Sequence, residues 1–551
     1  MLGLRRVLCA GLCFAVTSVS ALPPQYAFRI SLKDKQGSPS VSNPLSFLSQ
    51  RAIDRRNAQG IAIDTTDVPV SPVYINDILS VTGGKLHLTS KWQNYVVILL
   101  TDSSAMPTIR TKPYTTDVQY VGYFPDGLYK SGGGNIEGDA LAKGTGSASY
   151  YGGTYEQTRL VNGDYLHDRG YKGKGKLIAV FDEGFAGVDT GPAFDSMMKS
   201  GRLVDKYNFV TATNNVFNAY NHGTGCLSTM AGNLPGTYVG SAPEAQYALY
   251  VSEYRMGDMP VELDQMVAAT ERADSVGADI ISSSVAYNTF IPPFTSLTYA
   301  DIDGKTTVAA KGANIATAKG MLFVITAGNE GGNTWNYILT PGDADSAITV
   351  GSVNNSKVPA SNSGFGPNSS GRTKPDVCMQ GQNATIMYSG PLPTLSPGTS
   401  FATPQLAGWA ACLWQATTNG TPSRMRQAII KSAHMYNTPG NQIGYGVPDF
   451  GLAHSLLGIK DTPKTVDADN WLTASPNPVK DEVTVWVYMQ QAGKVSLVVN
   501  DAAGKQLYEK EYTLPTGKHQ LFVPVSGMPG GVYMLNARTE SKQKSIKLQK
   551  H

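Results

Sequence analysis

Short apolar runs alternate with helix-like segments through the middle of the chain. Runs of the buried-strand type lie at 176–181, 246–252, 278–282, 321–327 and 347–353, and residues 261–277 and 308–320 have the pattern of crossover helices. Such alternation predicts an α/β domain, at about 151–460, with a parallel sheet covered by helices on both faces. In folds of this class, sites lie at the carboxyl ends of the strands.

The two flanks have different patterns. Residues 22–145 combine strand-like runs at 85–90 and 94–100 with a helix-like run at 43–60, which predicts a small α+β unit. A Gly/Ser-rich stretch of the kind that links domains and invites proteolysis follows at 131–153. After 460–482, five short runs between 483 and 537 alternate apolar and polar residues, which predicts a small antiparallel β-sandwich at 461–551.

The first 21 residues have the layout of a secretory signal peptide. Arg5 and Arg6 precede an apolar run, and small residues end it at Ala21. The alternative is a buried N-terminal helix. No other stretch approaches the ~18 to 20 apolar residues of a membrane span, so we expect an exported protein.

Size and charge narrow the picture further. A chain of 551 residues is too long for one core and suggests about three domains. The net charge of +3, spread along the chain, gives no reason to expect a nucleic-acid partner.

The cysteines show no metal-ligand spacing. Cys9 and Cys13 leave with the signal peptide, and an odd number remains in Cys226, Cys378 and Cys412. A disulfide framework or a zinc site is therefore not expected. Sequence alone leaves open whether two of the three pair.

Four reactive side chains stand at the ends of predicted elements. Asp182 follows a buried strand, where an unpaired carboxylate is costly. His222 heads a predicted helix, Asn329 ends a strand, and Ser400 begins a helix that carries Pro404 near its first turn. Taken singly, such residues are more often turn, cap or structural residues.

Together these four residues meet one chemical need. A serine hydroxyl attacks a carbonyl when an imidazole accepts its proton and a carboxylate orients that imidazole. The oxyanion that results needs donors, which an Asn amide and a backbone N–H at a helix N-terminus supply. Asp182, His222, Asn329 and Ser400 match these roles and indicate an acyl-transfer enzyme.

The surrounding motifs resemble those of the subtilisin-like serine peptidases. "AVFDEG", "NHGTG", "ITAGNEGG" and "GTSFATPQLAG" are similar to the Asp, His, oxyanion-Asn and Ser boxes of that family, in the same order. The resemblance implies Asp182 as orienting carboxylate, His222 as general base and then acid, and Ser400 as nucleophile. It implies that the Asn329 amide and the Ser400 N–H hold the oxyanion, with proteins or peptides as substrates and no cofactor for catalysis. The calcium sites of the family are not recognisable in this sequence, so we predict none.

The match departs from the family pattern at three places. Glu183 stands where small hydroxylated residues are common, and Phe401 where Met is common. Ser284, Val285 and Ala286 resemble one wall of the primary specificity pocket but replace its usual Ser-Leu-Gly. The resemblance therefore leaves side-chain preference open.

Each flank resembles a known accessory domain. By position, size and linker, 22–145 resembles the family's prodomains, which inhibit the cleft until cleavage, here expected between Ser131 and Gly153; an additional binding domain is the alternative. The C-terminal unit, with "ASPNPVKDEVTV", "GMPGGVYML" and a basic end, resembles the type IX secretion sorting domain, and a generic binding sandwich is the alternative.

The sequence thus predicts a secreted serine endopeptidase made as a zymogen, with its prodomain as an internal inhibitor and the secretion machinery as a partner. One alternative is an inactive surface adhesion or scaffold protein on the same fold, which substituted triad positions would favour. Another is an esterase or ligase with the same triad. Whether the protein stays on the cell surface is left open.

Overall fold

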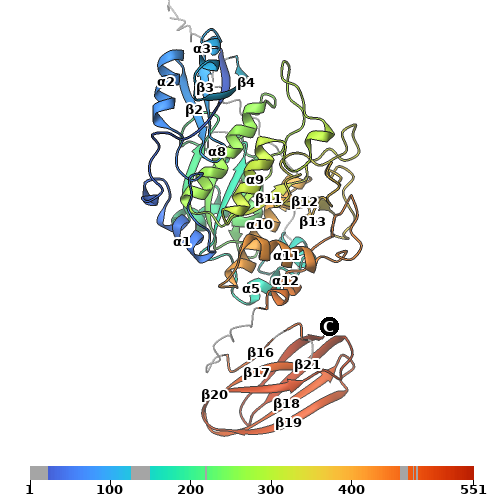
Figure 1. Cartoon of the computed structure of the whole chain (residues 1–551). Coiled ribbons are helices and arrows are strands. Elements are labelled where there is room, and N and C mark those ends of the chain that lie inside the picture. Colours follow the sequence, from blue (N-terminus) through green and yellow to red (C-terminus); the bar gives the residue numbers. More distant parts are fainter. Residues whose placement is uncertain are drawn as a thin grey trace, which may run out of the picture.

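A computed structural model describes residues 23–125, 149–217, 220–458, 470–475, 477–479 and 482–550. The predicted signal peptide and residues 131–148 of the expected cleavage region lie outside these ranges. Figure 1 shows the N-terminal α+β unit, called the prodomain below after the family unit that it resembles, at one end of the molecule. The α/β domain lies in the middle and the sandwich at the other end. Among the described residues, no helix combines the length and the apolar character of a membrane span.

The α/β domain is built on seven parallel strands. Their order is β13 (Val377–Gln380), β12 (Ile348–Val353), β11 (Leu322–Thr326), β10 (Ile280–Ser283), β5 (Leu177–Asp182), β9 (Gln246–Val251) and β6 (Leu203–Asn208). The five predicted strands form the centre of this sheet, which confirms the predicted fold. The two edge strands of this sheet, β6 and β13, were not predicted.

Helices cover both faces of the sheet because side chains along each strand alternate in direction. From β5, Ile178 and Val180 pack with α7 (His222–Ala231) and α10 (Thr399–Gln415), whereas Ala179 and Phe181 pack with α8 (Pro260–Val276) and α9 (Val308–Ala318). The remaining described α-helices of the domain are α4 (Tyr155–Leu160), α5 (Asp164–Asp168), α6 (Asp195–Lys199), α11 (Pro422–Ser432) and α12 (Phe450–Leu456). Two small hairpins pair β7 (Asn233–Leu234) with β8 (Tyr238–Val239) and β14 (Ala384–Ile386) with β15 (Thr394–Ser396).

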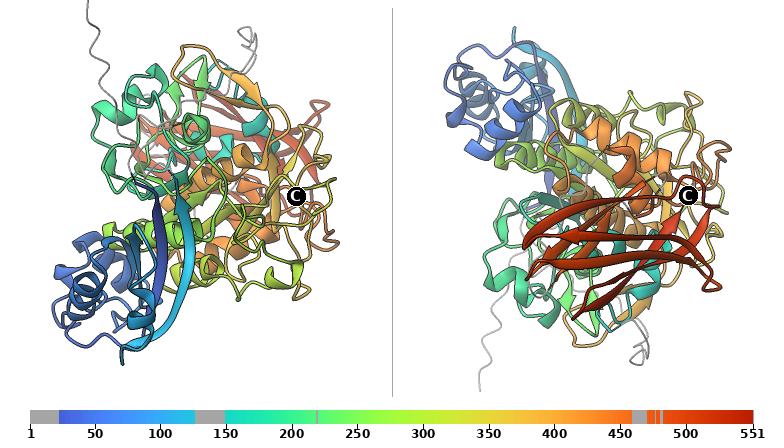
Figure 2. Two further views of the ribbon diagram at one scale, coloured as in Figure 1. Left: turned by 90° about the horizontal axis from the view of Figure 1, so that it is seen from above. Right: turned by 90° about the horizontal axis from the view of Figure 1, so that it is seen from below.

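The prodomain is a four-stranded antiparallel sheet with three helices. Its strand order is β2 (Lys85–Ser90), β3 (Tyr95–Leu100), β1 (Gln25–Leu32) and β4 (Thr115–Phe124). Helices α2 (Pro72–Thr82) and α3 (Met106–Arg110) cover one face, α1 (Gln50–Ala58) lies near α8, and the other face shares an apolar core with α8 and α9. The two units are therefore packed as one body, with the prodomain on one side of the α/β domain (Figure 2, left).

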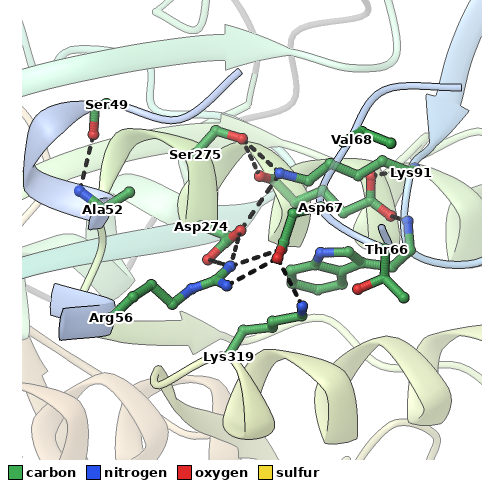
Figure 3. A network of polar contacts seen from close by, with 12 residues as sticks. Ser49, Ala52, Arg56, Thr66, Asp67, Val68, Lys91, Asp274, Ser275 and Lys319 are labelled. Atoms are coloured by element: carbon green, nitrogen blue, oxygen red, sulfur yellow. Dashed lines mark hydrogen bonds and ion pairs between the residues drawn. The ribbon is translucent and has the colours of Figure 1, made fainter. Parts of the chain in front are cut away.

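Buried ion pairs stabilise the contact between the prodomain and the α/β domain (Figure 3). The Arg56 guanidinium bonds to Asp67 of the prodomain (3.0 Å) and to Asp274 of α8 (2.8 Å), and all three side chains are fully buried. Lys319, just after α9, donates to Asp67 at 2.9 Å. Charges of alternating sign thus cross the boundary between prodomain and α/β domain.

The C-terminal unit is a sandwich of two antiparallel sheets. One sheet has the order β16 (Leu472–Ser475), β17 (Glu482–Met489), β20 (Gly517–Pro524), and the other β19 (Gln506–Leu514), β18 (Gly493–Asp501), β21 (Gly531–Arg538), β22 (Gln543–Lys550). Figure 2 (right) shows these strands in front of the α/β domain when the molecule is seen from below. The five predicted runs correspond to β17–β21, and the predicted basic end forms most of β22.

One lysine is fully buried in the α/β domain. The Lys374 ammonium donates to the carbonyl oxygens of Ala344 (3.0 Å) and Ala347 (3.2 Å), to the Thr349 hydroxyl (2.8 Å) and to the Asp376 carboxylate (2.8 Å). Burial lowers the pKa of Lys374, and Asp376 opposes that effect. The ammonium therefore ties the segment before β12 to the start of β13.

Candidate active site

Asp182 and His222 meet at the carboxyl end of β5. Asp182 ends the strand with its side chain fully buried, and His222 is the first residue of α7. The Nδ1 atom of His222 lies 2.7 Å from Oδ1 of Asp182. Gly223 makes this approach feasible, since a Cβ there would lie 2.7 Å from the Asp182 Cβ. The contact leaves Nε2 as the imidazole nitrogen available to a second partner.

Burial and the carboxylate act on His222 in opposite directions. Desolvation lowers the pKa of the imidazole, but the adjacent Asp182 charge and its hydrogen bond outweigh it, so the pKa is raised well above its usual value. The arrangement therefore stabilises the imidazolium, which is the form that a histidine takes when it has accepted a proton as general base.

Ser400 is the second residue of α10, with 7% of its surface exposed. Its hydroxyl donates to the carbonyl oxygen of Ser284 at 3.4 Å, and the Ser284 hydroxyl donates to the carbonyl oxygen of Ser400 at 2.8 Å. The nucleophile candidate and the predicted specificity wall are thus bonded to each other. His222 and Ser400 line the same cavity.

Pro404 lies inside α10 rather than at its edge. A proline has no N–H to give to the carbonyl four residues earlier, which is that of Ser400. Donors from outside the helix take its place: the Ser284 hydroxyl and the Cys226 thiol, at 3.3 Å. The proline costs less than it would elsewhere because this carbonyl is satisfied.

The Asn329 side chain is held from behind. Its Oδ1 accepts from the backbone N–H of Thr399 (3.0 Å) and from the Thr399 hydroxyl (2.9 Å), and Thr326 donates in turn to that hydroxyl at 2.7 Å. With the oxygen fixed by Thr399, the amide NH₂ remains for the cavity that Asn329 lines. Thr399 is thus a positioning residue that the sequence analysis missed, although it stands beside Ser400 in the printed motif.

All seven residues singled out from the sequence line or directly support one cavity of about 290 Å³. Six of them line it, and Asp182 lies behind His222. The lining also includes residues that the sequence analysis did not select as site residues: Glu183, Glu253, Arg255, Thr326, Gly328, Glu330 and Leu339. Leu339 packs against Gly328, where a Cβ would come within 2.5 Å of it.

Glu183 changes the surroundings of Asp182. It supplies no hydroxyl to the buried Oδ2 of Asp182, which lacks a hydrogen-bond partner among the described residues. Instead, the Glu183 carboxylate pairs with Arg255 at 3.0 Å. Burial and the neighbouring Asp182 raise the pKa of Glu183.

One trio in the described part of the chain has the side chains for a metal. Ligand atoms of Asp182, His222 and Cys226 lie within 4.8 Å of one another. The Nδ1 atom of His222 is already bonded to Asp182, so an ion there would compete with that contact. Cys226, Cys378 and Cys412 are all buried free thiols, which answers the question that the sequence left open.

Comparison with known families assigns all three units. A sequence model of the subtilase family matches residues 173–446. The peptidase S8 propeptide domain of Bacteroidota matches 27–128, and the secretion system C-terminal sorting domain matches 474–551. The last match indicates export by type IX secretion.

Individual relatives agree with this assignment. The chain is 29% identical over 306 residues to a thermophilic serine proteinase of Bacillus sp. (strain AK1), covering 55% of this chain and 67% of the relative. It is 26% identical to subtilisin DY of Bacillus licheniformis, over 50% of this chain and 89% of the relative, and 26% identical to subtilisin E of Bacillus subtilis, over 67% and 82%. The α/β domain belongs to the subtilase family of serine endopeptidases, and the chain also carries that family's propeptide and a secretion sorting domain.

Proposed function

We propose that Ser400 attacks the scissile carbonyl of a peptide while His222 Nε2 takes its proton. Asp182 then stabilises the imidazolium, and the Asn329 amide together with the Ser400 N–H receives the oxyanion. The proton passes from His222 to the leaving amine, and water releases the acyl group by the same steps in reverse. The observation that carries this proposal is the 2.7 Å contact of His222 with Asp182 beside a cavity that His222, Asn329 and Ser400 share.

The prodomain is, in this proposal, the enzyme's internal inhibitor. Strand β4 brings it to the rim of the cavity: the Tyr123 N–H donates to the Met259 sulfur at 3.2 Å, and the Phe124 ring meets Tyr254 edge-on at 5.3 Å. Tyr254 lies between Glu253 and Arg255, which line the cavity. The chain that follows β4 therefore starts beside the site that it would block.

The C-terminal sandwich would be the part that the secretion machinery recognises. Its basic last strand, β22, includes Lys544, Lys547 and Lys550. We propose no cofactor for catalysis, because each step above uses a side chain or backbone group of the chain itself.

Labelling with a fluorophosphonate tests the proposal directly. The wild-type protein should be labelled at Ser400, and the Ser400→Ala variant should not. Ser396→Ala, a change four residues upstream in β15, serves as the matched control and should be labelled like the wild type. Absence of label in a folded wild-type protein would favour the scaffold alternative.

Sequencing the N-terminus of the same preparation tests maturation. Cleavage between Ser131 and Gly153 in the wild type, absent from Ser400→Ala, is the expected result for a zymogen that processes itself. Hydrolysis of ester but not of amide substrates would favour the esterase alternative.

A further inference from the structure

More acidic side chains than basic ones line the substrate cleft. Three carboxylates line it, those of Glu183, Glu253 and Glu330, against one guanidinium, that of Arg255. Arg255 is already engaged, since it pairs with Glu183 at 3.0 Å and lies over the Tyr220 ring at 4.6 Å. Two of the three acidic side chains, those of Glu253 and Glu330, therefore have no basic side chain of the cleft to pair with.

Glu253 is the carboxylate without a partner. It follows β9, is partly buried and lines the cavity together with His222 and Ser400. Among the described residues, no hydrogen bond or ion pair reaches its side chain, whereas Glu330 accepts from the Asn333 amide. A half-buried carboxylate in this state is unfavourable until a donor or cation reaches it.

We propose that Glu253 selects substrates with a cationic side chain, arginine or lysine, at one of the two residues before the cleaved bond. The inference rests on the proposed function, which places the peptide in this cavity. The specificity wall of Ser284, Val285 and Ala286 lines the same cavity but has no charged side chain. A cationic substrate side chain would therefore find no charge of opposite sign on that wall. Hydrogen bonds that involve a charged group are among the stronger ones, and a guanidinium fits a carboxylate with two.

The electrostatics of the empty cleft agree with this proposal. Burial, followed by the charges of nearby carboxylates, raises the pKa of Glu253 to about 8. The titratable groups that act on or with it are Asp182, Glu183, His222, Asp258, Glu262 and Tyr287. An arriving cation stabilises the ionised carboxylate, so binding is coupled to loss of the Glu253 proton.

Matched peptides test the proposal on the full, self-processed enzyme. Peptides of one sequence carry arginine or its neutral isostere citrulline at the first or the second residue before the cleaved bond, and the readout is the ratio of kcat/KM values. The wild type should prefer arginine on the order of tenfold to a hundredfold at one position. Glu253→Gln should bring that ratio close to one, whereas Glu330→Gln should retain most of it.

The pH dependence of the same ratio is a second readout. Below pH 8 the empty cleft holds Glu253 protonated, so the arginine preference should grow on the order of tenfold from pH 7 to pH 9. The titration of His222 affects both peptides alike and cancels in the ratio. In Glu253→Gln the ratio should stay flat.

The outcomes separate the inference from the proposed function. Equal cleavage of both peptides by the wild type, or collapse of the ratio in Glu330→Gln but not in Glu253→Gln, would overturn the role of Glu253 and leave the peptidase intact. Failure to cleave either peptide, with Ser400 unlabelled, would overturn both.

Discussion

The prodomain interface and the substrate cleft both bury charge, but they do so in opposite ways. At the interface, Arg56, Asp67, Asp274 and Lys319 each have an oppositely charged partner within 3.0 Å. In the cleft, Glu253 has no such partner. The charges of the interface are thus already paired within the protein, whereas Glu253 in the cleft gains a charged partner only when a ligand binds.

The energetic consequences differ accordingly. Loss of one member of a buried network leaves the others uncompensated and is strongly destabilising. An unpaired carboxylate, by contrast, already costs stability in the free protein and becomes favourable only on binding. Substitutions at the interface should therefore change the free energy of unfolding, and substitutions in the cleft should change the rate of turnover.

The largest expected effect is on the cleft side of this comparison. Ser400→Ala removes the attacking oxygen, so kcat should fall by a factor on the order of 10⁴ or more. Thermal unfolding of the unprocessed Ser400→Ala chain should remain a cooperative transition, which shows that the variant is folded. If Ser400→Ala lost activity because it unfolded, the expectation that cleft residues affect turnover rather than stability would be contradicted.

Asn329→Ala should come next. It removes one oxyanion donor while Ser400 and His222 remain, and kcat should fall on the order of 10² to 10³-fold. Because Asn329 is solvent-exposed, stability should change little. Steady-state kinetics on a peptide amide measure the effect, and a loss confined to KM would contradict the assigned role.

On the interface side, Asp274→Ala should act on stability. It leaves Arg55, Arg56 and Lys91 without their common carboxylate and should lower the free energy of unfolding by about 3 to 5 kcal/mol. Chemical denaturation of the Ser400→Ala chain, in which we expect the prodomain to stay attached, measures this change. Arg272→Gln, on the same helix, breaks a half-exposed pair with Asp205 and should cost less than about 1 kcal/mol. Equal effects of the two changes would contradict the importance of the buried network.

A smaller effect than that of Asp274→Ala concerns His87 of β2, which is buried beside Gln265 of α8 with 3.3 Å between their side-chain nitrogens. Burial lowers its pKa to about 4, against about 6.5 for a free histidine. The docked state thus binds fewer protons than the undocked state between these values, so docking weakens as the pH falls from about 6.5 toward 4.

From pH 7 to pH 5, the titration of His87 should lower the equilibrium constant for docking of the prodomain on the order of tenfold. Hydrogen exchange in β2, compared at each pH between the Ser400→Ala chain and the same chain with His87→Gln, isolates this contribution from that of other groups. Equal pH dependence in both chains would show that His87 does not sense the interface.

The sequence predicted the parts of this molecule where burial imposes a uniform pattern. The five central strands are largely apolar and almost entirely buried because helices cover both of their faces. Edge strand β6, "LVDKYN", mixes polar residues with apolar ones and offers no such signal. The same reasoning applies to Asp182, which is conspicuous because it ends an apolar run.

Site residues that depend on tertiary contacts were harder to predict. Glu253 and Arg255 lie in the segment between β9 and α8, and only the folded chain shows that this segment borders the cleft. The sequence around Cys226 gives no sign of its role, yet its thiol donates to the carbonyl that Pro404 leaves without an N–H. Such compensation joins Ser400 to residues 116 (Ser284) and 174 (Cys226) positions away and has no local pattern.

Lys374 has a consequence for the conditions that the catalytic domain tolerates. Two carbonyl oxygens, a hydroxyl and a carboxylate around its ammonium form the type of oxygen-rich shell with which proteins hold dissolved metal ions. Here the cation is covalently part of the chain, so it can be neither diluted away nor removed by a chelator. The junction between β12 and β13 therefore keeps its central charge in a medium depleted of divalent ions.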